Sequence, residues 1–169
     1  MEKCEYCELL EREWSVIASS ADVVIAVKDK VITPGQITIF PKEHFTIMEL
    51  VPEPILQQCI ILANKVSRAI FESLGSQGTN LLVRNGLGAG QDAAHFGIEI
   101  IPRREEDGLN LQWEPRQLPE YELETVYNTL LSAIEEAQQT AKKGLIAEKK
   151  IVKAEHKDNY LLKSLKRRP

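Results

Sequence analysis

The chain has 169 residues, of which 43% are hydrophobic and 27% are charged, a composition that indicates a soluble globular domain with at most one appendage. No apolar run approaches 18 residues, which argues against a membrane span. The acidic start MEKCEYCELLEREW lacks the apolar core of a signal peptide, so we expect a cytoplasmic protein. The net charge of −4 conceals a basic tail, because residues 140–169 carry ten Lys or Arg against three Asp or Glu.

The first half of the chain predicts a short helix, three strands and a longer helix, in that order. The short helix is expected over residues 4–12, and the strands are expected at WSVIAS, DVVIAVK and QITIF. From Pro52 to Leu74, apolar residues recur every three or four positions, which predicts an amphipathic helix that Gly75 ends. The buried stripe of this helix is expected to contain Ile55, Cys59, Leu62, Val66, Ala69 and Ile70.

The second half predicts two further strands, at TNLLVRN and AAHFGIEII, on either side of the glycine-rich loop GLGAGQ. A helix is expected from Pro119 to Lys143, with Leu123, Val126, Tyr127, Leu130, Ile134 and Ala137 as its apolar stripe. The order of the elements predicts an α+β fold, in which helices pack on an antiparallel sheet of about five strands. We expect a domain over residues 1–118 and a C-terminal helical extension over residues 119–169.

The last predicted strand, within QDAAHFGIEIIPR, alternates between two kinds of residue. Phe96, Ile98 and Ile100 share one face, which we expect to point into the core. His95, Gly97 and Glu99 share the other face and follow the glycine-rich loop. A polar strand face beside such a loop is where we expect a functional site.

Two segments, PGQITIFPKEHFTIMELVPE and NLLVRNGLGAGQDAAHFGIEIIPR, resemble the histidine-triad (HIT) superfamily. The usual pattern of that family has a Pro-Gly-His turn, a Pro-Lys-x-His segment, an Ala-Gly-Gln loop and a His-x-His-x-His strand followed by Pro-Arg. The resemblance covers roughly residues 4–104. It implies a HIT-like fold, a homodimer, and nucleotidyl transfer or hydrolysis in which the middle histidine attacks the α-phosphate.

Carried over to this chain, the three triad positions are His95, Gly97 and Glu99. Glycine has no nucleophilic atom, so the usual covalent step cannot start at the middle position. Glu99 would face the phosphate and repel it, and Gln36 stands where the family usually has the histidine of the turn. The resemblance therefore implies a degenerate triad, and we expect a nucleotide-binding or regulatory protein without the usual activity.

The resemblance also implies a zinc site, because some HIT proteins bind zinc through an N-terminal Cys-x-x-Cys pair and two histidines. The matching positions are Cys4, Cys7, His44 and His95. Two sulfurs and two imidazoles complete a tetrahedral zinc shell, and a closed shell of this kind is structural. The alternative is two ordinary thiols in a short helix and a histidine buried in a strand.

Four residues are candidates for nucleotide contact: Asp29 for a ribose, and Asn85, Gly90 and Gln91 for a phosphate. The alternative is that GLGAGQ is a plain connecting loop.

Glu99 has three further interpretations. It could be a solvated glutamate at the mouth of a cleft, it could pair with Arg84 and fill the former phosphate site, or it could act as a general base on a water molecule in an unusual hydrolase.

The basic tail, residues 142–168, has interpretations of its own. It could be a solvated helix face, it could bind an acidic partner or nucleic acid, or it could be the working part of an interaction module.

Overall fold

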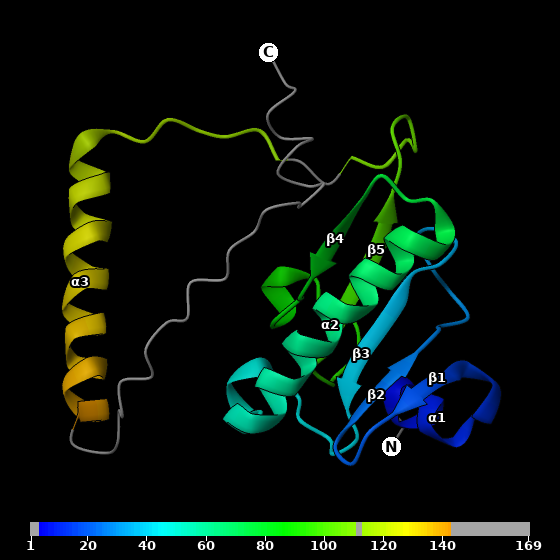
Figure 1. Cartoon of the computed structure of the whole chain (residues 1–169). Coiled ribbons are helices and arrows are strands. Elements are labelled where there is room, and N and C mark those ends of the chain that lie inside the picture. Colours follow the sequence, from blue (N-terminus) through cyan, green and yellow to red (C-terminus); the bar gives the residue numbers. More distant parts are fainter. Residues whose placement is uncertain (1–3, 111–112, 143–169) are drawn as a thin grey trace, which may run out of the picture. The chain divides into compact units, whose positions relative to one another are not determined.

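The computed structural model describes residues 4–110 and 113–142, and the first of these ranges forms an α+β fold around a five-stranded antiparallel sheet (Figure 1). The strand order is β1-β2-β3-β5-β4. The strands are β1 (Val16–Ser19), β2 (Val23–Ala26), β3 (Ile37–Pro41), β4 (Gly78–Leu82) and β5 (Ile98–Arg103). The helices are α1 (Glu5–Glu11), α2 (Glu53–Leu74) and α3 (Glu120–Lys142), with short 3-10 turns η1 (Glu13–Ser15), η2 (Met48–Leu50) and η3 (Leu87–Ala89). The predicted fold class and number of strands are confirmed.

Helix α2 covers one face of the sheet (Figure 1). It follows Pro52, which is compatible with a helix start, and it ends at Gly75, whose φ of 60° is the left-handed conformation that glycine adopts without strain. The core on this side includes Phe96, Ile98 and Ile100, as the alternation predicted. The predicted stripe of α2 holds except at Ala69, which is exposed, while Ala63 is buried in its place.

Helix α1 belongs to a second apolar cluster, formed by the residues that alternate with those of the first. Tyr6 and Leu9 of α1 are buried with residues that point to this face of the sheet, Val24, Ala26 and Phe40 among them. In β2 the neighbours Val23 and Val24 belong to different clusters, because successive side chains of a strand point to opposite faces. Both faces of the sheet are therefore buried where α1 and α2 cover them.

The strand that carries the candidate site begins later than the sequence predicted. We expected it to include residues 93–97, but β5 starts at Ile98. Before that point the chain leaves the ladder, and the backbone N–H of Phe96 donates to the carbonyl of Phe45, at 2.6 Å. The alternation of faces continues through this irregular segment, since Phe96 still joins the core under α2.

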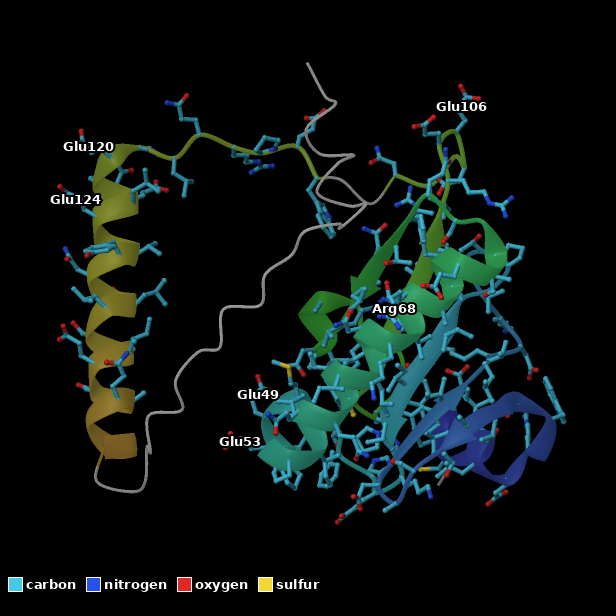
Figure 2. All side chains as sticks on the ribbon, in the orientation of Figure 1. Glu49, Glu53, Arg68, Glu106, Glu120 and Glu124 are labelled. Atoms are coloured by element: carbon cyan, nitrogen blue, oxygen red, sulfur yellow. The ribbon has the colours of Figure 1, made fainter. Side chains whose placement is uncertain are left out.

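The chain divides into two compact units, Met1–Leu109 and Asn110–Pro169. In the second unit, α3 forms where the sequence predicted it, and its side chains project from all sides of the helix, with Glu120 and Glu124 on its first turns (Figure 2). The predicted division at residue 118 stays a prediction. Residues 143–169 lie outside the described residues, so the interpretations of the basic tail stay predictions as well.

Within residues 4–110 and 113–142, the helices lack the combination of length and apolar content that a membrane-spanning helix requires.

Candidate metal centre and adjacent ion-pair cluster

Four side chains from three separate segments meet beside α1. Cys4 caps the N-terminus of α1 and Cys7 lies one turn further on, so their sulfurs share one side of the helix. His44 follows β3 and His95 precedes β5. Their ligand atoms all lie within 4.8 Å of one another. The structure therefore brings together the four residues that the sequence singled out for a metal.

The distances in this cluster suit a small tetrahedral ion. Nδ1 of His95 lies 3.7 Å from the sulfurs of both Cys4 and Cys7, and Nδ1 of His44 lies 3.3 Å from the sulfur of Cys7. A tetrahedral zinc ion with its usual bond lengths separates a sulfur from a nitrogen by about 3.5 Å. The donor set, two sulfurs and two nitrogens, thus fits a metal ion of this kind without rearrangement.

His95 is oriented for metal binding by its other ring nitrogen. Nε2 lies 2.9 Å from the carbonyl oxygen of Pro41, so it carries the proton and donates to that carbonyl. Nδ1 is then left without a proton on the side of the two sulfurs, which is the arrangement seen in metal-binding histidines. Burial lowers the pKa of His95, with the nearby His44 adding to the effect, and this favours the neutral imidazole that binds metals.

Beside this cluster, the buried carboxylate of Glu99 lies at the centre of a group of charges that reaches from the interior to the surface. Its Oε1 is 3.1 Å from Nζ of Lys28, and its Oε2 is 3.1 Å from Nη2 of Arg84. Arg84 also lies 3.6 Å from Asp92, and Lys28 lies 3.5 Å from Glu5. The predicted pair between Arg84 and Glu99 is confirmed. The interpretation of Glu99 as a solvated side chain is wrong, because it is only 4% exposed.

Between the charges and the metal centre, the ring of Tyr6 packs directly on Gly97. A Cβ atom added at position 97 would lie 2.5 Å from Cε2 of Tyr6, which is closer than real Cβ contacts. Burial raises the pKa of the Tyr6 phenol far above its usual value, and the negative charge of Glu99 adds to this. The cavity left here has a volume of about 10 Å³, which is about the least that can hold a single water molecule.

The four candidates for nucleotide contact make hydrogen bonds within the domain instead of lining one site. Asp29 accepts from Arg12 at 2.6 Å, Asn85 donates to both carboxylate oxygens of Glu49 at 2.8 Å, and Gly90 ends the η3 turn with a φ of 73°. Gln91 accepts from the N–H of Gly86 at 2.7 Å, donates to two backbone carbonyls, and lines the small cavity near Gly97.

Gln36, at the expected turn position, is also used internally. Its Oε1 accepts from the backbone N–H of Ile32 at 2.7 Å, and the residue is buried.

Tyr6 and Lys28 are the site residues that the sequence analysis missed. Tyr6 stands between the two cysteines of the Cys-x-x-Cys pair, but the packing of its ring on Gly97 is a contact between distant segments that no local pattern signals. Lys28 follows the apolar run VVIAV, two residues after β2, and nothing in that pattern marks it as buried.

Comparison with known proteins identifies a family model and several relatives that are similar to this chain. A family model described as "HIT domain" matches residues 10–106, more than half of the chain. A relative named Adenylylsulfatase HINT3, from Arabidopsis thaliana, is 31% identical over 71% of this chain, and the match spans only 60% of the plant protein. A relative named Adenosine 5'-monophosphoramidase hnt1, from Schizosaccharomyces pombe, is 26% identical over 78% of this chain and 98% of its own length.

Solved structures agree on the fold. A member of the HIT family from Bacillus subtilis superposes with a TM-score of 0.68 at 22% identity, over 87% of this chain and all of that one. A structure described as a Zn-bound histidine triad family protein, from Mycobacterium smegmatis, superposes with a TM-score of 0.59 at 21% identity, over 68% of this chain and 84% of that one. The expected HIT-like fold is thereby confirmed. The chain belongs to the HIT domain family.

Proposed function

We propose that this protein is a zinc-binding member of the HIT family that has lost the usual nucleotidyl chemistry and works as a nucleotide-binding or regulatory protein. The observation that carries the proposal is the contact between Gly97 and Tyr6. At the position where the family's nucleophile is expected, there is no side chain, and the ring of another residue fills the space. A reaction that begins with attack by an imidazole has no starting group there.

Zinc is proposed for Cys4, Cys7, His44 and His95 on the chemistry of the donors. Two sulfurs with two imidazoles are typical of structural zinc sites, and the donor distances given above suit such a shell. The description of the Mycobacterium smegmatis structure as Zn-bound adds support. A bound zinc ion would hold α1 against the sheet, and with all four positions taken by the protein it would leave no open position for a substrate.

A second observation argues against phosphate binding at the former active face. Two cations on this face, Lys28 and Arg84, are already engaged by the carboxylate of Glu99. A nucleotide phosphate would have to displace that carboxylate or lie close to its charge. The same two ion pairs disfavour Glu99 as a general base, since a base must have a free oxygen within reach of a water molecule.

The experiment that tests the proposal is calorimetric titration of the purified protein with AMP, GMP and diadenosine polyphosphates, with the zinc content measured on the same sample. The names of the Arabidopsis and yeast relatives suggest adenosine phosphoramidate and adenylyl sulfate as further ligands. We expect one zinc per chain and no turnover of any of these compounds. Saturable binding at micromolar concentration would favour the nucleotide-binding form of the proposal, and the absence of heat would favour the regulatory form.

Turnover of any of these compounds would contradict the loss of chemistry. A zinc-free preparation that is fully folded would contradict the metal assignment.

We also propose that the protein forms a homodimer. Strand β4 lies at one end of the strand order, so one of its edges has no strand partner among the described residues. Leu81 on β4 is 48% exposed, and Ile60 and Ile61 on α2 are about as exposed. Exposed apolar residues on an edge strand and a helix are typical of an interface. Light scattering should give twice the chain mass, and a Leu81→Lys variant should give the mass of one chain. A monomeric wild-type protein at micromolar concentration would contradict the dimer.

A further inference from the structure

Helix α1 covers the residues that would otherwise be open on this face of the sheet. Tyr6 is only 4% exposed and its ring lies 4.9 Å from the ring of Phe40 and 5.5 Å from that of His95, measured between centroids. Below it, Gly97 has no room for even a methyl group. Tyr6 therefore closes the space above Gly97 from the side of α1.

The same helix covers Lys28. The amino group of Lys28 lies 5.2 Å from the centre of the Tyr6 ring and 3.5 Å from a carboxylate oxygen of Glu5. Both of these residues belong to α1. The other partner of Lys28, Glu99, belongs to the sheet, and the side chains of Lys28 and Glu99 are each 6% exposed. Burial of this ion pair thus depends on α1 staying in place.

Helix α1 has few means of holding itself there. It is seven residues long, and the cap residue Cys4 makes no capping hydrogen bond through its side chain. Helices of this length are unstable alone and depend on tertiary contacts. Those contacts include the buried side chains of Tyr6 and Leu9, the pair of Arg12 with Asp29 after the helix, and the two sulfurs that face His44 and His95. A metal ion bound by Cys4 and Cys7, on either side of Tyr6, would connect α1 to His44 and His95.

We propose that α1 is a lid locked by the metal, and that loss of the metal opens the face formed by Lys28, Gly97 and Glu99. The inference rests on the zinc binding proposed above. In the closed state the hydroxyl of Thr38, paired with Glu99 across β3 and β5, is buried without a hydrogen-bond partner among the described residues. Opening of α1 would let water hydrogen-bond to the Thr38 hydroxyl and would expose Lys28 to anions. The bound metal would therefore be needed to keep α1 closed.

Chemical labelling of Lys28 tests the lid directly. The zinc-loaded protein and the same protein treated with a chelator are reacted with acetic anhydride, and the acetylation of each lysine is followed by peptide mass spectrometry. We expect Lys28 to react about tenfold faster after zinc removal, or more, while the exposed Lys30 and Lys42 react equally in both samples. Equal rates at Lys28 would overturn the proposal.

Cys59 distinguishes opening of the lid from unfolding of the domain. It lies on the face of α2 that packs on the sheet and is fully buried, so it should stay unreactive toward a thiol reagent after zinc removal. Simultaneous exposure of Cys59 and Lys28 would mean that the whole domain unfolds, and this too would overturn a local lid.

Coupling between lid and metal must also work in the reverse direction, because linkage between two equilibria is reciprocal. A Gly97→Ala substitution pushes Tyr6 away and should weaken zinc binding, measured by competition with a chromophoric chelator, by about tenfold. In a Tyr6→Ala background the same substitution meets no ring and should leave zinc affinity unchanged. A Gly97→Ala protein with wild-type zinc affinity would contradict the lid while leaving the zinc proposal intact. A wild-type protein that does not bind zinc would contradict both.

Discussion

Lys28 and Glu99 form an ion pair inside the domain: Nζ of the lysine lies 3.1 Å from Oε1 of the glutamate, and both side chains are 6% exposed. Arg84 binds the second oxygen of the same carboxylate. The charges on this face of the sheet are therefore balanced by the chain itself.

Removal of Glu99 should be costly, because it leaves two cations facing each other in a buried place. For Glu99→Gln we expect a loss of about 3–5 kcal/mol in the free energy of unfolding, measured by urea denaturation. The matched control is Glu72→Gln on α2, which breaks the exposed pair of Glu72 with Arg68 and should cost less than about 1 kcal/mol. A loss at Glu99 as small as at Glu72 would show that the buried cluster is energetically unimportant.

The metal proposal predicts that substitution of a ligand cysteine removes zinc, while substitution of the core cysteine does not. Cys7→Ser and His44→Ala should reduce the zinc content well below one ion per chain. Each should also lower the free energy of unfolding by about 4 kcal/mol when free zinc exceeds its Kd about a thousandfold. Cys59→Ala should keep its zinc, because this thiol lies in the core and burial raises its pKa to about 11.

Plasma emission spectrometry and thermal melts measure both quantities. Full zinc content in the Cys7→Ser protein would refute this ligand set.

Restoring a histidine at position 97 should not restore activity. The space for that side chain is occupied by Tyr6, so Gly97→His should be destabilised by about 1–3 kcal/mol through overpacking. We expect no hydrolysis of adenosine phosphoramidate by this variant, because the imidazole cannot reach a position for attack. Turnover by the single variant, measured by release of AMP, would mean that Tyr6 does not block the site.

The ion pair of Asp107 with Arg103 should stabilise the folded protein at neutral pH and lose this effect in acid. Hydrogen bonds from Arg103, followed by those from backbone N–H groups, lower the pKa of Asp107 far below its usual value of 3.8. A carboxylate whose pKa is lowered by folding stabilises the native state above its unfolded pKa, and this contribution is lost as the pH falls toward the folded value. The difference in melting temperature between wild type and Asp107→Asn should therefore be largest near pH 6 and should shrink below pH 4. A difference that is constant with pH would rule out this origin.

The helices and strands could be predicted from the sequence because they depend on local patterns, and the candidate metal ligands could be predicted from the family resemblance. The recurrence of apolar residues predicted α2 and α3 within a residue or two, since an apolar stripe repeats with the period of a helix. The stripe of α2 packs largely in the core, whereas Leu123, Val126, Tyr127, Leu130 and Ile134 of α3 are exposed. The four candidate ligands followed from the family resemblance, and Arg84 and Glu99 were paired because both depart from its pattern. Glu99 lies on β5 and Arg84 follows the end of β4, and these two strands are neighbours in the sheet.

Contacts between distant segments were not accessible in this way. Nothing local distinguishes Tyr6 from any other tyrosine of a short helix, and its role depends on how α1 packs on the segment before β5. Lysine is rarely buried, and no local pattern singles out Lys28, whose charge Glu99 and Glu5 compensate. The late start of β5 was not predicted because residues 93–97 keep the alternating pattern of a strand. Their backbone nevertheless leaves the sheet, since the N–H of Phe96 donates to the carbonyl of Phe45.

The most direct test of the account is native intact mass spectrometry of the purified protein after incubation with adenosine phosphoramidate. A single spectrum reports the metal bound to each chain and any covalent adduct. The account predicts a mass increase equal to one zinc ion and no adenylyl group on the chain. A chain that carries an adenylyl group would contradict the central claim that attack on phosphorus has no starting group in this protein.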